Sequence, residues 1–98
     1  MLEAVKNALR ITHGALDSEI VSIINAALLD MSRVGIVTDK IDIADSATYD
    51  ELILQCVTLY SKWNFNFLSK SEQWLKAYEN LRNAMSLCSY YNGGDADE

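Results

Sequence analysis

Few residues of this sequence have the types and spacing that catalysis requires. His13 is the only histidine, and it lies beside Gly14 in ITHGA, a stretch typical of a turn. Cys56 and Cys88 have no histidine near them in the sequence, and they lack the close spacing of metal-binding cysteines. A glycine-rich phosphate loop is also absent. The sequence therefore predicts no catalytic residue, no cofactor and no metal, and we expect a protein that is not an enzyme.

Three aspartates, Asp39, Asp42 and Asp45, come nearest to the pattern of a metal site. They recur at every third residue, whereas a calcium loop of the EF-hand type needs ligands at alternate positions, a central glycine and a terminal glutamate. Because those features are missing, we interpret the three carboxylates as solvated surface.

The composition favours one all-α domain. The chain has 98 residues, 50% of them hydrophobic, which is enough for a core. It has no proline and only 4 glycines, whereas β-sandwiches and barrels need many turns. No apolar run reaches the roughly 18 residues of a membrane span, and the N-terminus lacks the apolar core of a signal peptide. Cys56 and Cys88 have apolar surroundings, so we expect two buried free thiols in a reducing cytoplasm.

The charge disfavours nucleic acid as a binding partner. The formal net charge is −6 and the sequence pI is about 4.6, whereas nucleic-acid-binding domains usually carry a basic patch. A helix-turn-helix also needs a second helix whose polar or basic side chains read bases. The helix expected after ITHGA is apolar on most sides, and Arg33 is its single basic residue. Sequence-specific DNA binding is therefore not expected.

Residues 17–34, DSEIVSIINAALLDMSRV, have the most regular pattern. Their apolar residues recur about every 3.6 positions, which predicts a helix and not a strand. Asp17 stands where an N-cap is expected, and Gly35 can adopt the left-handed conformation that ends a helix. Because the apolar stripe is wide, we expect this segment to be the central helix of a small bundle.

Three further helices are expected around it. The first covers residues 2–10, with Lys6 exposed. Thr48-x-x-Glu51 is a capping box that predicts the start of a third helix, running to about residue 67. Ser69-x-x-Glu72 is a second capping box, and the fourth helix that it starts has an apolar seam continuing to Cys88.

The segment between the second and third helices, IVTDKIDIADSA, has a different pattern. Ile41 and Ile43 alternate with polar residues, with the period of two that a strand shows. A single strand is unstable in water and would need a partner strand from another chain. We favour a loop folded onto its own core, and pairing with another chain is the alternative.

Five apolar residues are the candidates for subunit or partner contacts: Ile36, Ile41, Ile43, Phe65 and Phe67. The two phenylalanines cannot face the same way on one helix, so one of them should be exposed or lie under the following turn, as interface residues often do. We expect a single helical domain over residues 1–90. Residues 91–98 lose the helical pattern and are expected to form a disordered acidic tail.

The order of these features resembles the phage head–tail connector family. The similarity is carried by two segments, Val5-Lys6-x-x-Leu9-Arg10-Ile11 and Asp17-x-x-Ile20-x-x-x-Ile24-x-Ala26-Ala27. It continues through the aromatic residues Tyr60 and Trp63 to the pair Leu81-Arg82, and so covers about residues 2–82.

The resemblance implies a structural role in a virion. Members of the family form a ring, usually a dodecamer, that docks under the portal protein at the head–tail junction. The ring extends the DNA channel and is the platform for stopper or tail-completion proteins, while DNA passes through the lumen without sequence-specific binding. The implied location is the virion neck, and the host cytoplasm during assembly. Neither catalysis nor a membrane belongs to this role.

A second class of function fits the composition alone. A small acidic helical regulator, such as an inhibitor that covers a basic surface of one host protein, would also have this size and charge. Self-association discriminates between the two, because a ring subunit recognises copies of itself and a regulator binds one foreign partner.

Overall fold

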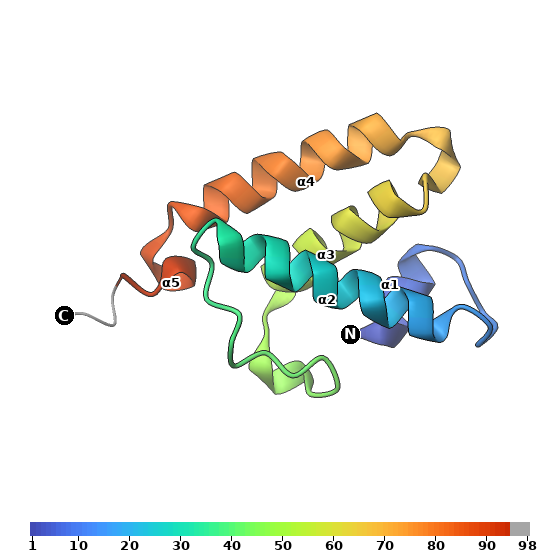
Figure 1. Cartoon of the computed structure of the whole chain (residues 1–98), viewed down its shortest axis with the longest axis horizontal. Coiled ribbons are helices and arrows are strands. Elements are labelled where there is room, and N and C mark those ends of the chain that lie inside the picture. The colour runs from blue at the N-terminus through green and yellow to red at the C-terminus, as the bar shows by residue number, and fades with distance from the viewer. Residues whose placement is uncertain (95–98) are drawn as a thin grey trace.

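The computed structural model describes residues 1–94, and within them the chain is all-α, as the sequence predicts. Figure 1 shows four main helices and a short C-terminal one. The elements are α1 (Leu2–Ala8), α2 (Asp17–Arg33), η1 (Ser46–Thr48), α3 (Glu51–Asn64), η2 (Phe67–Ser69), α4 (Ser71–Ser86) and α5 (Ser89–Asn92). Here η denotes a short 3-10 helix.

The central helix of the bundle is α3, and the prediction that residues 17–34 would have that place is wrong. Helix α3 packs against α4, α2 and α1. Its buried residues include two polar ones, Thr58 and Ser61. Their hydroxyls donate to the carbonyls one turn earlier, at 2.8 and 2.9 Å, so burial leaves neither hydroxyl unpaired. Such internal bonding lets α3 bury more than one face.

Helix α2 buries one face, as its spacing predicts. Its buried residues are Ile20, Ile24, Ala27, Leu28 and Met31. Leu29, on the other side, is 68% exposed. The helix ends as expected, since Gly35 has a φ of +99°, a conformation that glycine adopts without strain.

Asp17 does not cap α2, contrary to prediction. Its carboxylate lies 2.8 Å from the ammonium of Lys6 on α1. Lys6 was expected to be exposed but is buried where α1 packs on α2. The hydrogen bond to Asp17 raises the pKa of Lys6 and outweighs the opposing effect of burial. A buried ammonium needs such a partner, and this need determines where Asp17 points.

Neither predicted capping box forms. Helix α3 starts later, at Glu51, because the carboxylate of Asp50 accepts the backbone N–H of Ile53 at 3.0 Å. The Thr48 hydroxyl instead donates to backbone carbonyls of the preceding loop. Helix α4 starts at Ser71, whose N–H donates to the Asn66 side chain at 3.1 Å.

Residues 36–45 form a loop on their own core, as favoured above, and lead into η1; no strand occurs within residues 1–94. Ile41 and Ile43 are half-buried against the core. The Met1 ammonium donates to the carbonyl of Ile43 at 2.7 Å, which ties the loop to the N-terminus.

The C-terminal part differs from expectation in two ways. Cys88 follows the end of α4 and is exposed, so the prediction of two buried thiols holds only for Cys56. Tyr91 and Asn92, expected in a disordered tail, lie in α5. The Tyr91 hydroxyl donates to Asp50 at 2.7 Å, and its carbonyl accepts the N–H of Val37 at 2.8 Å. Residues 95–98 lie outside the described part of the chain, so the expected tail there stays a prediction.

Candidate functional site

The described residues contain no group of three or more metal-binding side chains placed to hold an ion. None of the helices in residues 1–94 is long and apolar enough to cross a membrane. His13 is exposed, and its Nδ1 accepts the N–H of Ala15 at 3.3 Å. The described part of the chain does have a polar cluster between two helices and exposed apolar side chains at its surface.

The three candidate isoleucines differ in how deeply they are buried. Ile36 is 2% exposed and belongs to the core, so it is not available for contact with a partner and we remove it from the candidate interface. Ile41 and Ile43 are half-buried in the loop. Ile41 also lines a cleft of about 330 Å³, together with Tyr49, Ile53 and Tyr91.

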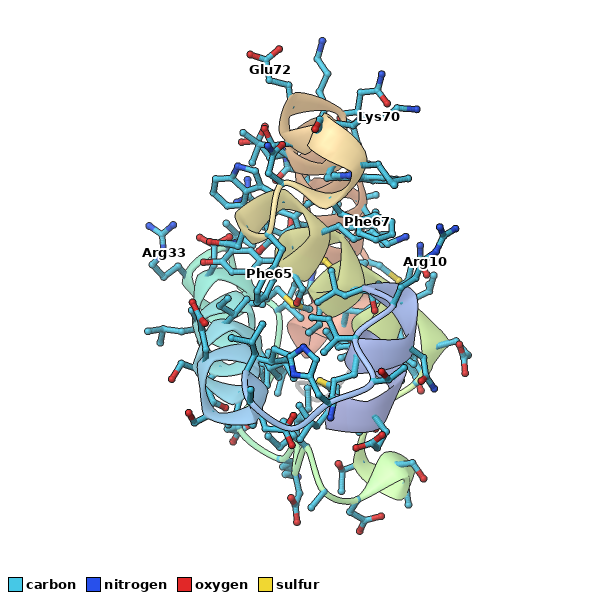
Figure 2. The ribbon with its side chains drawn as sticks, turned by 90° about the vertical axis from the view of Figure 1, so that its right-hand side faces the viewer. Arg10, Arg33, Phe65, Phe67, Lys70 and Glu72 are labelled. Atoms are coloured by element: carbon cyan, nitrogen blue, oxygen red, sulfur yellow. The ribbon has the colours of Figure 1, made fainter. Side chains whose placement is uncertain are left out.

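The turn between α3 and α4 holds both candidate phenylalanines. Helix α3 ends at Asn64, before the expected residue 67, and both rings are half-buried. Figure 2 shows Phe67 on the side of Arg10, with Phe65 lying apart from it. The Phe67 ring lies 6.2 Å from that of Trp74, whose indole N–H donates to the Phe67 carbonyl at 2.8 Å.

The backbone of this turn is strained. Asn66, Leu68 and Ser69 have φ values of 48°, 54° and 57°, in the left-handed region that residues with a Cβ rarely adopt. Each such residue costs about 1–2 kcal/mol, somewhat less for asparagine. Leu68 in this turn is 57% exposed, whereas Phe67 and Trp74 are half-buried. Strain of this kind gathers where a surface must hold one shape for a function.

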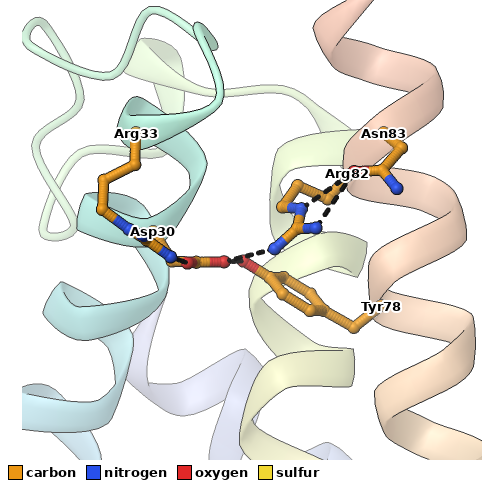
Figure 3. Close-up of polar contacts among 5 residues, drawn as sticks. All are labelled: Asp30, Arg33, Tyr78, Arg82 and Asn83. Atoms are coloured by element: carbon orange, nitrogen blue, oxygen red, sulfur yellow. Dashed lines mark hydrogen bonds and ion pairs between the residues drawn. The ribbon is translucent and has the colours of Figure 1, made fainter.

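A polar cluster joins α2 to α4 across α3 (Figure 3). The Tyr78 hydroxyl donates to Asp30 at 2.5 Å, and the Arg82 guanidinium lies 2.9 Å from the same carboxylate oxygen. Arg33 pairs with the other oxygen. Arg82 in turn donates to the side chain of Asn83 from Nε and Nη2.

Two arginines and a tyrosine hydroxyl keep the Asp30 carboxylate ionised in this cluster. Burial alone would raise the pKa of Asp30, but the hydrogen bonds that the carboxylate accepts outweigh it and lower the pKa to about 2. Burial and the bond to Asp30 raise the pKa of Tyr78 above its usual range. The cluster connects α2 to α4, two helices that otherwise make few contacts with each other. We therefore interpret it as structural. Sequence reasoning missed it because Asp30 and Arg82 are far apart in the chain.

One comparison with known proteins identifies the family. The sequence model of a family described as Phage connector protein matches residues 1–92. This chain belongs to the phage connector protein family. No curated protein and no solved structure matches it.

The family match ends at residue 92, whereas the resemblance seen in the sequence ends at about residue 82. It includes all of α5, whereas the domain predicted over residues 1–90 includes only its first two residues. The phage connectors are a structural family and are not known as enzymes.

Proposed function

We propose that this connector is a subunit of the ring at the head–tail junction of a tailed phage or prophage. The ring docks under the portal protein, extends the DNA channel, and forms the platform for a stopper or tail-completion protein. The observation that carries the proposal is the family match over residues 1–92.

The distribution of apolar side chains supports assembly. A closed ring needs two different patches on each subunit, which meet head to tail. The monomer offers the loop with Ile41 and Ile43 below the bundle, and the turn with Phe67 and exposed Leu68 at the end of α3. These two regions lie far apart in Figure 1, where the loop is green and the turn is yellow-orange.

The acidic charge is compatible with a DNA channel. A lumen of net negative charge repels the phosphate backbone, so DNA slides through it without being held. The net charge of −6 has the sign that such a lumen needs. In this proposal the protein acts in the virion neck and is present in the host cytoplasm before assembly.

Binding to the portal tests the proposal. The connector is mixed with the portal protein encoded in the same genome, and the mixture is sedimented through a gradient. The proposal expects the connector to co-sediment with portal rings at one copy or more per portal subunit. Failure to bind the portal, together with a one-to-one complex with a single host protein, would instead establish the acidic regulator.

A further inference from the structure

The cations of this acidic chain are unevenly placed. Lys6, Arg33 and Arg82 each form an ion pair with an aspartate, and of the three only Arg33 is exposed. Among the residues 1–94, the remaining lysines and arginines form no ion pair. Of these, Arg10 follows α1, Lys62 lies on α3, and Lys70 lies between η2 and α4. Figure 2 shows Lys70 at the top of the molecule and Arg10 lower, on the right-hand side.

Aromatic rings hold two of these cations in place. The Arg10 guanidinium lies 5.7 Å from the centre of the Phe67 ring. The Lys62 ammonium lies 5.3 Å from the same centre and 4.7 Å from that of Trp74. These distances are within the range of cation–π attraction. The cations are thus oriented without being neutralised by a carboxylate.

The strained turn adds an exposed apolar residue, Leu68, next to Phe67 in the chain. We call these side chains together the η2 surface: Arg10, Lys62, Phe67, Leu68, Lys70 and Trp74. Leu68 is held outward by its left-handed backbone and is 57% exposed. Exposed apolar and aromatic side chains together with charged ones have the composition of a protein-binding site. Glu72 is also exposed nearby and offsets part of the positive charge.

The complementary charge lies at the other end of the same molecule. Asp39, Asp42 and Asp45 are exposed in the loop, where Ile41 and Ile43 are half-buried among them. In Figure 2 the loop is at the bottom, whereas Lys70 is at the top. The two surfaces therefore cannot meet within one subunit.

We infer that the η2 surface binds the acidic loop, residues 39–45, of a second copy of this chain. Because the two surfaces are different and lie at opposite ends, the contact is head to tail and continues from copy to copy. This inference rests on the proposed ring and names the contact that would build it. Duplex DNA is a less favourable partner for the η2 surface than a second copy of the chain. Three cations on a chain of net charge −6 are few for binding to a phosphate backbone.

Charge reversal gives a direct test. One variant reverses the η2 surface, Lys62→Glu with Lys70→Glu, and another reverses the loop, Asp39→Lys with Asp42→Lys. Self-association is measured by sedimentation velocity over a wide protein concentration range at low salt. Each variant alone should associate about tenfold or more weakly than the unaltered protein, because like charges then face each other.

Mixing the two variants distinguishes contact from damage. In an alternating chain of the two, every η2 surface again faces a loop of opposite charge, so the equimolar mixture should recover the association of the unaltered protein. Glu3→Lys with Glu19→Lys makes the same change of charge as the loop variant, at exposed positions outside both surfaces. Lys76→Glu, also exposed and outside both surfaces, is a single reversal of the same sign as the η2 variant. These controls should associate as the unaltered protein does.

Glycine substitutions test the role of the strained turn. Leu68→Gly and Ser69→Gly both relieve a left-handed residue and should both raise the melting temperature. Only Leu68→Gly removes the exposed apolar side chain, so only this variant should weaken association.

Several results would overturn the inference. The first is that both reversal variants associate as the unaltered protein does. The second is that mixing the two variants does not restore association. The third is that the unaltered protein stays monomeric at every concentration at low salt. A loss of duplex-DNA retention by the η2 variant, with association unchanged, would assign the surface to DNA instead. The proposed function fails separately: if the head-to-tail contact is found but the copies form open chains that do not bind the portal, the contact stands and the ring role does not.

Discussion

The carboxylate of Asp30 connects α2 to α4. It accepts hydrogen bonds from Tyr78, Arg82 and Arg33, and its side chain is 15% exposed. Asp30→Asn should lower the free energy of unfolding by about 1–3 kcal/mol, because the buried donors of Tyr78 and Arg82 lose their charged acceptor. Urea unfolding at neutral pH measures this difference.

The same substitution carries a pH dependence. The pKa of Asp30 is lowered to about 2 in the folded protein, below the value of about 3.9 for an unfolded aspartate. A lowered folded-state pKa contributes stability above the unfolded value, and that contribution is lost as the pH falls through the folded value. The stability difference between the unaltered protein and Asp30→Asn should thus be constant above about pH 5 and shrink from pH 4 toward 2. A difference that is equal at pH 6 and pH 2 would contradict this origin.

The two thiols should react at very different rates. Burial raises the pKa of the Cys56 thiol to about 12, and reaction requires the thiolate. Cys88 is exposed after α4. At pH 8 a thiol reagent should modify one cysteine rapidly and the second only when the protein is unfolded. The variant Cys88→Ser should abolish the rapid phase, and persistence of that phase would show that Cys56 is accessible.

At the scale of elements, α2 supplies a matched pair of leucines. Leu28 is 9% exposed in the core and Leu29 is 68% exposed. Leu28→Ala should cost about 2–5 kcal/mol of stability, because it leaves a cavity. Leu29→Ala should change stability by no more than about 0.5 kcal/mol. Equal melting temperatures for the two variants would mean that α2 is not packed as described.

Periodicity predicted the helices well, but local signals predicted their ends poorly. The spacing from Ile20 to Met31 specifies the buried face of α2 because that face depends only on the chain itself. The caps depend on partners elsewhere in the fold. Asp17 is drawn to Lys6, and Thr48 bonds to the preceding loop, so neither acts as the N-cap that its position indicates.

The candidate interface was predictable only in part, for the same reason. Ile41, Ile43 and Phe67, which were chosen from their patterns, are half-buried and stay candidates, whereas Ile36 belongs to the core. Leu68 was missed because its exposure comes from left-handed backbone at residues without glycine, which no sequence pattern signals. The centrality of α3 likewise follows from tertiary packing and not from the width of an apolar stripe.

At the scale of the whole molecule, the loop should control assembly and not folding. Ile41→Asp with Ile43→Asp should leave the helical content intact, since the loop contributes no helix before η1, and should block association. Circular dichroism and sedimentation measure the two effects.

A matched control separates apolar contact from charge. Ala44→Asp with Ala47→Asp adds the same two charges at exposed positions of the same loop region. This control should keep its association, because added acidity suits a basic partner surface. Unchanged assembly of the Ile41→Asp, Ile43→Asp variant would remove the loop from the account.

The central claim is that this connector forms a ring beneath the portal. The measurement that tests it most directly is the mass of the purified protein by light scattering over a wide concentration range, alone and with the portal protein, with negative-stain imaging of the largest species. The account predicts ring-shaped particles, dodecameric if the family's usual copy number holds, alone or stacked on portal rings. A species of 11.0 kDa under every condition, with no particle bound to the portal, would contradict it.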